Sequence, residues 1–389
     1  MHSFEITPLR SLQLGSWFKL ICGASYQDLA AVRNLTLAYA LAGADCIDVA
    51  ADPAVIRAAK AGLDKAGPIA DEAGRQYVRP WLMVSMSAGA DPHFRKAWFD
   101  SQQCPSDCWR PCEKVCPADA IDRTGVIRDR CYGCGRCLPI CPLGLIAASS
   151  HPTPLNHVAQ QVLYQADALE IHTHVGQRDA FQALWQTIQP SISHLKLISI
   201  SCPDGEALIG YLKDLQQIMA STRADPVVTP PYVIWQTDGR PMSGDIGKGT
   251  THAAIRLAQK VLASDLLSGN GLSASGLSTD GLSTDDRVLN ASSFVQLAGG
   301  TNQYTVEKLR DLKLLNQAGS GRLKSGLSVS GIAYGSFARR LLMPIIEQTL
   351  YLEEVTPTLW KAVALAESLV EPLKKQLRNN RYTLQGHDC

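Results

Sequence analysis

The sequence predicts an α/β protein in which eight parallel strands, most of them followed by a helix, close into a barrel. Short apolar runs alternate with amphipathic stretches along most of the chain, and one cysteine-rich segment interrupts that alternation after the third run. Alternation of this kind is typical of parallel strands with crossover helices. An open doubly wound sheet gives the same local pattern, but a count of eight strands favours a (β/α)8 TIM-like barrel.

The individual elements follow from the position of the apolar runs. The predicted strands are Lys19–Gly23, Cys46–Ala50, Trp81–Ser85, Ala168–His172, Leu197–Ser201, Val233–Thr237, Phe294–Leu297 and Ile332–Gly335. The predicted helices are Gln27–Ala42, Val55–Ala66, Leu155–Gln165, Asp179–Ile188, Glu206–Ala220 and Thr251–Ala263.

Two segments break the alternation. The cysteine-rich residues 91–150 fall between the third strand and its helix, so we expect them over the barrel mouth, where the loops that follow barrel strands lie. Residues 264–286 repeat Gly-Leu-Ser and are otherwise small and polar, which predicts a flexible loop. The predicted organisation is therefore a barrel made of residues 1–90 and 151–389, with residues 91–150 as an inserted module.

The composition limits the class of protein. The 389 residues include 46% hydrophobic residues, enough for a full core, and 37 basic residues against 36 acidic ones give a formal net charge of +1. This balance argues against nucleic acid as a partner. The chain has no long apolar run and no signal-peptide pattern at its start, so we expect a cytoplasmic protein without a transmembrane segment.

The second half of the cysteine-rich segment has the spacing of a bacterial-type ferredoxin. Cys131, Cys134, Cys137 and Cys141 follow the pattern C-x2-C-x2-C-x3-C and are followed by Pro142. The first half has three residues in every gap and also ends in Cys-Pro; its cysteines are Cys104, Cys108, Cys112 and Cys116. The segment therefore predicts a module with two 4Fe–4S clusters. The longer gaps of the first half leave room for a three-iron, 3Fe–4S form of one cluster.

In two-cluster ferredoxins the fourth cysteine of each run binds the other cluster. This rule assigns one cluster to Cys104, Cys108, Cys112 and Cys141, and the other to Cys116, Cys131, Cys134 and Cys137. Zinc is the alternative, but a tetrahedral zinc site requires neither the triple-cysteine run nor the Cys-Pro ending. We expect Gly133 and Gly135 to let backbone amides approach the cluster sulfurs. The four remaining cysteines are scattered, as buried structural cysteines are; they are Cys22, Cys46, Cys202 and Cys389.

Polar residues at the ends of the predicted strands are candidates for a site at the barrel mouth. They are Asp48, Ser85, His172, His174, Cys202, Asp238 and Gln296. His172 and His174 alternate with Glu170 on one strand face, a spacing suited to a metal ion or a proton relay. No third ligand is evident from the sequence, and structural or exposed histidines are the alternative.

Glycines near the last two strands suggest a place for a phosphate group. Gly299 and Gly300 follow the seventh strand, and Gly335 and Ser336 lie where the eighth strand passes into a helix. Backbone amides and a helix N-terminus at this end of a barrel bind phosphate, so a flavin such as FMN is a candidate ligand. Tight glycine turns are the alternative. The run at 244–250 lacks the first glycine and the magnesium-binding hydroxyl of a P-loop, which excludes nucleotide hydrolysis of that type.

The whole chain resembles the light-dependent period A family of cyanobacteria. The resemblance is carried by the run LGSWFKLICGAS at residues 14–25 and the run CPSDCWRPC at residues 104–112. It implies an iron–sulfur protein of circadian clock input that senses cellular redox state, which follows photosynthetic electron flow. It also implies clock input and oscillator proteins as partners, with quinones or ferredoxin as redox donors, and a location at the periphery of the thylakoid membrane.

Two functions therefore compete. The first is a redox-sensing regulatory protein that needs no substrate site. The second is an iron–sulfur oxidoreductase in which the clusters exchange electrons with a flavin or another phosphate-bearing ligand at the barrel mouth. A plain electron carrier is the weakest interpretation, since it leaves the barrel without a role.

Overall fold

The computed structural model describes residues 7–116, 118–150, 161–221, 231–240, 247–267, 293–315 and 328–383, with side chains as far as residue 375. Within these ranges, parallel strands close into a barrel in the order β1-β12-β11-β10-β9-β8-β3-β2. The barrel strands are β1 (Trp17–Gly23), β2 (Cys46–Ala50), β3 (Trp81–Ser87), β8 (Ala168–His172), β9 (Leu197–Pro203), β10 (Tyr232–Asp238), β11 (Ser293–Ala298) and β12 (Gly331–Tyr334). The predicted fold class is confirmed.

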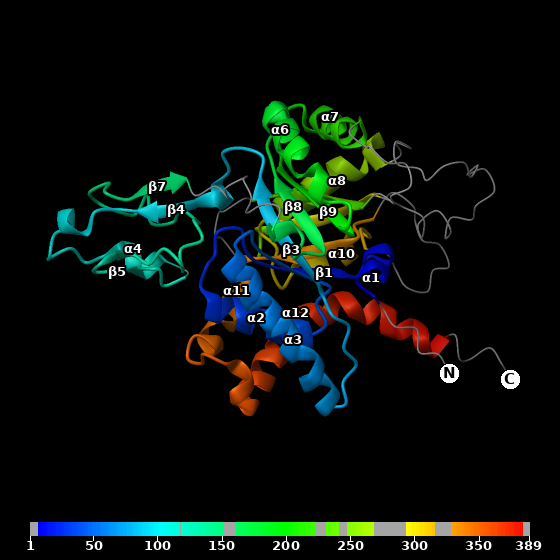
Figure 1. Cartoon of the computed structure of the whole chain (residues 1–389), viewed down its shortest axis with the longest axis horizontal. Coiled ribbons are helices and arrows are strands. Elements are labelled where there is room, and N and C mark those ends of the chain that lie inside the picture. Colours follow the sequence, from blue (N-terminus) through cyan, green and yellow to red (C-terminus); the bar gives the residue numbers. More distant parts are fainter. Residues whose placement is uncertain are drawn as a thin grey trace.

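Helices cover the outside of this barrel (Figure 1). They are α2 (Leu29–Leu41), α3 (Pro53–Glu72), α6 (Arg178–Ile188), α7 (Leu208–Ser221), α8 (Thr251–Leu262), α10 (Thr305–Asp311), α11 (Ser336–Ile346) and α12 (Thr356–Thr383). Short 3-10 helices η3 (Gln189–Ser191), η4 (Asp265–Leu267) and η5 (Leu352–Glu354) follow α6, α8 and α11. Asp28 and Asp52 cap α2 and α3 by accepting hydrogen bonds from backbone N–H groups of the first turn.

The predicted elements overlap the observed ones, with corrections at their ends. Gly335, predicted as the last residue of a strand, is the N-cap of α11. Helix α3 continues past the predicted end at Ala66 to Glu72. Most of the predicted helix Leu155–Gln165 and most of the predicted loop 264–286 lie outside the described residues.

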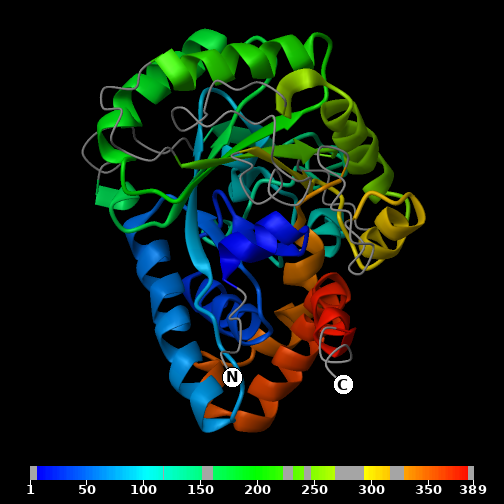
Figure 2. The same ribbon diagram turned by 90° about the vertical axis from the view of Figure 1, so that its right-hand side faces the viewer.

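The interior of the barrel is built in layers, because every second residue of a strand points inward. The first layer is apolar and packs against α1 (Pro8–Leu14), which lies at the end of the barrel opposite the cysteine-rich segment (Figures 1 and 2). Its members are Leu12, Trp17, Cys46, Met83, Ala168, Leu197, Ile234 and Phe294.

Two residues further along seven of the strands, the next layer is polar. It consists of Lys19, Asp48, Ser85, Glu170, Ser199, Gln236 and Gln296, all buried. The outward-facing residues of the same strands, such as Leu20, Val49 and Ile171, are apolar and pack against the helices in one large core. Stability therefore comes mainly from the strand–helix core, whereas the inside of the barrel carries charge.

The segment between β3 and β8 projects beside the barrel (Figure 1). It contains η1 (Pro92–Phe94), β4 (Arg95–Trp98), η2 (Ser101–Gln103), α4 (Pro111–Val115), β5 (Ile121–Asp122), β6 (Gly125–Val126) and β7 (Ala147–Ser150). Strands β4 and β7 pair antiparallel, so Arg95 lies opposite Ser150 and the segment leaves and rejoins the barrel through one two-stranded stem.

Candidate functional site

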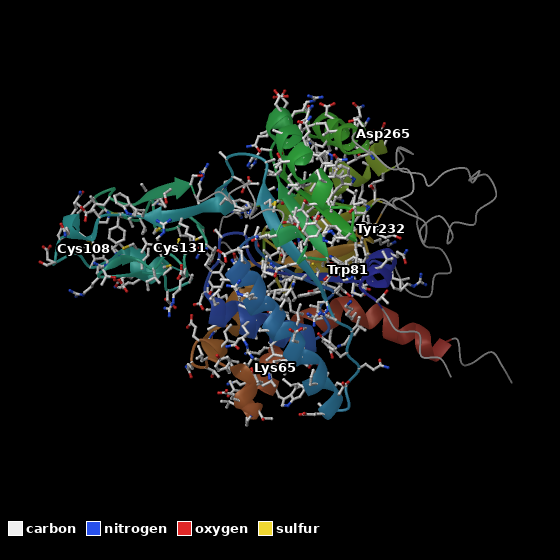
Figure 3. The ribbon with its side chains drawn as sticks, viewed as in Figure 1. Lys65, Trp81, Cys108, Cys131, Tyr232 and Asp265 are labelled. Atoms are coloured by element: carbon white, nitrogen blue, oxygen red, sulfur yellow. The ribbon has the colours of Figure 1, made fainter. Side chains whose placement is uncertain are left out.

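Four cysteines line a cavity of about 330 Å³ in the inserted segment; they are Cys116, Cys131, Cys134 and Cys137. Backbone N–H groups point at two of the sulfurs: Ala97 N lies 3.3 Å from Cys131 Sγ, and Ala120 N lies 3.2 Å from Cys116 Sγ. Such donors stabilise negative charge on sulfur and tune a bound cluster. We call this the inner cavity because Cys131 lies between Cys108 and the barrel (Figure 3).

The backbone around the inner cavity requires glycine at one position. Gly133 has a φ of 74°, and a Cβ built on it would lie 2.0 Å from the carbonyl oxygen of Arg95. Gly135 has a φ of 73°, but a Cβ there would meet nothing within 4 Å. Gly133 therefore allows the cysteine run to lie directly against β4, whereas Gly135 serves only the turn.

The other four cysteines line a second cavity, of about 320 Å³, which we call the outer cavity; they are Cys104, Cys108, Cys112 and Cys141. Apolar side chains such as Phe99 and Ile146 complete its wall. Arg110 Nη1 lies 3.7 Å from Cys104 Sγ, so a cation faces this group of thiols. The two cavities divide the eight cysteines into the same two groups that the exchange of the fourth ligand predicts.

The donor chemistry of both cavities fits iron–sulfur clusters. Each holds four sulfur donors, and among the described residues no cysteine is in a disulfide. In the inner cavity, burial and the neighbouring thiols raise the pKa of Cys137 to about 12, because several thiolates cannot gather without a compensating positive charge. A bound iron–sulfur cluster would supply that charge.

Tyr132 connects the inner cavity with the barrel. Its side chain lines both this cavity and a pocket at the barrel mouth. The guanidinium of Arg339 stacks 4.2 Å from the centre of the Tyr132 ring, and Arg339 Nη1 donates to the carbonyl oxygen of Ile21 at 2.9 Å. A second contact lies nearby, where Lys96 Nζ donates to Gln27 Oε1 at 2.7 Å.

The mouth pocket has a volume of about 740 Å³ and lies at the carboxyl ends of the strands. The four residues predicted to bind phosphate all line it: Gly299, Gly300, Gly335 and Ser336. Two cations, Arg240 and Arg339, line it as well, together with three acid–base groups, His93, His172 and Asp238.

Packing explains the glycines after β11. Gly299 and Gly300 have φ values of 68° and 89°. A Cβ on Gly299 would lie 1.8 Å from Asp238 Oδ1, and one on Gly300 would lie 2.6 Å from the carbonyl oxygen of Thr250. A tight turn therefore accounts for both glycines without a ligand. The carboxylate of Asp238 beside Gly299 also disfavours an anion at that amide.

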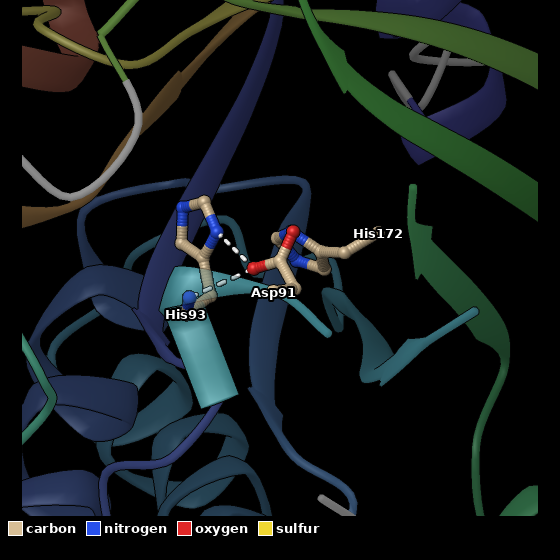
Figure 4. A group of neighbouring side chains, drawn as sticks. All are labelled: Asp91, His93 and His172. Carbon is tan, nitrogen blue, oxygen red and sulfur yellow. Dashed lines mark hydrogen bonds and ion pairs between the residues drawn. The ribbon is translucent and has the colours of Figure 1, made fainter. Parts of the chain in front are cut away.

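A cluster of histidines surrounds Asp91 on one side of the pocket (Figure 4). His93 Nδ1 lies 2.7 Å from Asp91 Oδ1, and His174 Nε2 lies 2.9 Å from Asp91 Oδ2. Burial by itself raises the pKa of Asp91, but the hydrogen bonds from His174 and His93 outweigh it and hold the pKa well below the usual range. The ring of His172 lies 4.4 Å from that of His93, centre to centre.

Beneath this cluster, the polar layer of the barrel is a buried ionic network. Glu170 contacts Lys19 directly, accepts from Gln236 Nε2 at 2.8 Å, and lies 3.2 Å from His172 Nε2. Burial alone lowers the pKa of His172, but Glu170 and Asp91 outweigh it and raise this pKa to about 9. Burial raises the pKa of Asp48 to about 7, although Lys19 opposes that shift.

Comparison with known proteins finds a relative that matches almost the whole chain. A protein described as Light dependent period A, from Synechococcus elongatus (strain ATCC 33912 / PCC 7942 / FACHB-805), is 52% identical over 369 residues, which cover 95% of this chain and 94% of the relative. The chain belongs to the light-dependent period A family. The resemblance noted in the sequence is thereby confirmed.

The domains of the light-dependent period A family match separate parts of the chain. Residues 104–152 match the LdpA Fe–S cluster-binding domain, so this segment is an iron–sulfur domain. Residues 162–280 and 271–372 match the Light dependent period A C-terminal domain. Two solved tryptophan synthases of Mycobacterium tuberculosis each have a TM-score of 0.37 and 12% identity; one covers 95% of this chain and 99% of its own, the other 94% and 96%.

The structure distributes the other predicted residues between the pocket and the barrel interior. His172 and Asp238 line the pocket, and His174 reaches Asp91. Asp48, Ser85 and Gln296, expected at the mouth, belong instead to the buried polar layer beneath it. Cys22, Cys46 and Cys202 are buried outside the inserted segment, whereas Cys389 lies outside the described residues.

The sequence did not single out three residues of the buried ionic network and the histidine cluster. These residues are Lys19, Asp91 and His93. Asp91 and His93 form an Asp-Pro-His run shortly after β3, and this run is a detectable signal, since polar residues after a barrel strand face the mouth. Lys19 interrupts an otherwise apolar run, which was also detectable. Among the described residues no helix is both long and apolar enough to cross a membrane.

Proposed function

We propose that this protein is a redox-sensing regulatory protein that carries two 4Fe–4S clusters. The observation that carries this proposal is the separation of eight cysteines into two groups of four, each around its own cavity. Cys104, Cys108, Cys112 and Cys141 bind the outer cluster; Cys116, Cys131, Cys134 and Cys137 bind the inner one. The match to an Fe–S cluster-binding domain and the N–H donors at the sulfurs support the assignment.

The contacts at Tyr132 give the inner cluster a route to the barrel. A change of cluster charge acts at close range on the Arg339 guanidinium, which stacks on Tyr132 and is anchored to the backbone of β1. A change in the oxidation state of the inner cluster therefore changes the electrostatic potential at the barrel mouth. The outer cluster, further from the barrel, is the entry point for electrons, and it is the cluster more prone to a 3Fe–4S form because its run is stretched.

The sensor passes its signal to the circadian clock. The relative from Synechococcus elongatus is described as Light dependent period A, and this family membership supports clock input and oscillator proteins as partners. Quinones or ferredoxin are the proposed redox donors. The proposed location is the cytoplasm, at the periphery of the thylakoid membrane.

A second function is favoured by one observation, the 740 Å³ pocket at the barrel mouth next to the inner cavity. In this alternative the clusters exchange electrons with FMN, whose phosphate lies against Gly299, Gly300, Gly335 and Ser336. Against it, Ser336 Oγ already accepts from Arg339 Nη2 at 3.3 Å, and the two glycines after β11 are explained by packing.

Anaerobic purification followed by iron, sulfide and flavin analysis separates the two functions. The sensor requires about eight iron and about eight sulfide per chain and no flavin, since each cubane holds four of each. Flavin at one equivalent per chain would favour the oxidoreductase. Zinc in place of iron would contradict both.

The ligand assignment is tested by Cys134→Ser, with Cys202→Ala as the matched control. Cys134 lines the inner cavity, whereas Cys202 is a buried cysteine of β9 outside the segment. The first variant should lose about half of the iron and one of two electron paramagnetic resonance signals. The second should lose neither. An unchanged iron content in Cys134→Ser would refute the assignment.

A further inference from the structure

Beside the mouth pocket, nitrogen and oxygen donors from two distant parts of the chain converge. Asp91 and His93 lie after β3, and His172 is the last residue of β8. Each of the three offers a ligand atom, and these atoms all lie within 4.8 Å of one another (Figure 4). The Asp91 Oδ1 and His93 Nδ1 atoms are 2.7 Å apart. Ligands on one ion at about 2.1 Å lie roughly 3 Å from each other, so little movement is needed.

Hydrogen bonds and ion pairs with neighbouring groups hold the three side chains in place. Asp91 is only 4% exposed, and its Oδ1 also accepts from the backbone N of His93 at 2.7 Å. His172 is 5% exposed, and its Nε2 faces the buried Glu170 carboxylate at 3.2 Å. A carboxylate behind a histidine orients the ring and leaves the other nitrogen for a metal ion. Lys19 in turn holds Glu170.

A buried carboxylate also lies on the far side of the His93 ring. Asp238, the last residue of β10, is 3% exposed, and its Oδ1 has no hydrogen-bond partner among the described residues. Its other oxygen, Oδ2, lies 3.3 Å from His93 Nε2. A carboxylate behind His93 Nε2 orients this ring and leaves Nδ1 for a metal ion, as Glu170 does behind His172.

From this geometry we propose that Asp91, His93 and His172 bind one first-row divalent transition-metal ion at the barrel mouth, with Asp238 orienting the His93 ring through its Nε2. Two imidazoles with one carboxylate suit such ions better than Mg²⁺ or Ca²⁺, which prefer oxygen alone. The ion faces the mouth pocket, where positions not taken by the protein are open to a small oxygen-bearing ligand. No thiol belongs to this donor set, so the site is distinct from both cysteine cavities.

Mn²⁺ is the probe that separates this site from the cysteines, because it is a hard ion that thiolates bind poorly. Anaerobic protein with its clusters intact is titrated with Mn²⁺, and the free ion is followed by its electron paramagnetic resonance signal. We expect one Mn²⁺ bound per chain, displaced by Zn²⁺ as the order of divalent-ion affinities requires. Displacement by an equal concentration of Mg²⁺ would instead indicate a carboxylate site and overturn the proposal.

The ligands are tested by His93→Ala, with His252→Ala as the control. His93 is a partly exposed side chain next to β4, and His252 is an exposed residue of α8 away from the pocket. His93→Ala should weaken Mn²⁺ binding at least about ten-fold, and His252→Ala should not change it. Because His172 is buried, Asp238→Asn serves as a second variant that keeps the side-chain shape and should also weaken binding.

Two results would refute the proposal: no Mn²⁺ bound by the unaltered protein, or unchanged binding in both His93→Ala and Asp238→Asn. Iron and sulfide are measured on every variant. If a variant keeps its full cluster content but loses Mn²⁺ binding, the effect arises at the barrel mouth. If a variant loses its clusters but still binds Mn²⁺, the result bears on the proposed iron–sulfur function and not on the proposed metal site. In Cys134→Ser, Mn²⁺ binding should be unchanged.

Discussion

Lys19 is an ammonium group with no access to water, inside the barrel. It contacts Glu170 directly and lies 3.7 Å from Asp48. Charges are buried in a protein at high cost, and they persist where opposite charges and hydrogen bonds compensate them. Here the compensation is shared with Gln236 and His172, which also contact Glu170. The network therefore stabilises the fold only as a complete set.

Replacing Lys19 by Met should lower the free energy of unfolding by roughly 3–5 kcal/mol, because it leaves the Glu170 carboxylate buried without its cation. Denaturant unfolding followed by tryptophan fluorescence measures the loss. The double variant Lys19→Met/Glu170→Gln should recover most of it, since both charges are then gone. A double variant no more stable than the single one would show that the ion pair is not the cause.

Asp48 makes stability depend on pH. Burial raises its pKa to about 7 in the folded protein, above its ordinary value. A raised carboxyl pKa gives stability that is complete below the unfolded pKa, about 4, and is lost as the pH rises through about 7. Asp48→Asn removes this titration. Its melting temperature relative to the unaltered protein should therefore be higher at about pH 8.5 than at about pH 5.5; the same difference at both pH values would contradict the shift.

At the scale of elements, the cysteine run depends on its contact with β4. The turn of Cys131–Cys137 lies so close to this strand that a Cβ at Gly133 would overlap the Arg95 carbonyl oxygen. The same strand donates the Ala97 N–H to Cys131 Sγ. Strand β4 is therefore both a wall of the inner cavity and a source of one of its hydrogen bonds.

Gly133→Ala should reduce the iron content by up to about half, because the inner cavity cannot keep its shape. Gly135→Ala is the matched control: it has nearly the same left-handed backbone, with φ of 73° against 74°, but open space around the Cβ position. It should keep its iron, at a cost in stability of about 1 kcal/mol. Equal iron loss in both variants would show that backbone strain matters and contact with β4 does not.

At the scale of the whole molecule, the inserted segment leaves the barrel through one stem and contacts it on either side of that stem. The stem of β4 and β7 carries the chain out and back, and Tyr132 and Lys96 make contacts beside it. Most of the apolar core lies between the barrel strands and their helices, and buried residues of the inserted segment such as Tyr132 and Ile146 continue it. We propose on this basis that residues 1–90 with 151–389, and residues 91–150, are separate domains.

Excision of the segment tests that proposal. Trp98 and Ala147 are partners at the end of the stem, so residues 99–146 can be replaced by an Asn-Gly turn, which closes a two-residue hairpin. The shortened protein should contain no iron but unfold cooperatively with the circular dichroism of an α/β fold. Failure to fold in repeated preparations, with the full-length protein stable in parallel, would show that the barrel needs the segment.

The sequence by itself determined the barrel strands and the cysteine pattern, because both signals are local. An apolar run marks a buried strand wherever its neighbours lie, and the gaps between Cys131, Cys134 and Cys137 are set by a few bonds. The ends of elements are not set locally, as Gly335 shows, because a cap depends on the geometry of the next element.

Only the tertiary structure decided which polar groups meet. Lys19 and Glu170 are 151 positions apart, and Asp91 lies far from His172 in sequence, yet the closed barrel places each pair in contact or within a few ångströms. Asp48, Ser85 and Gln296 looked like mouth residues, but the stagger of the strands put them one layer deeper. Periodicity gives the face on which a side chain lies; its depth and its partners depend on how eight strands close around one axis.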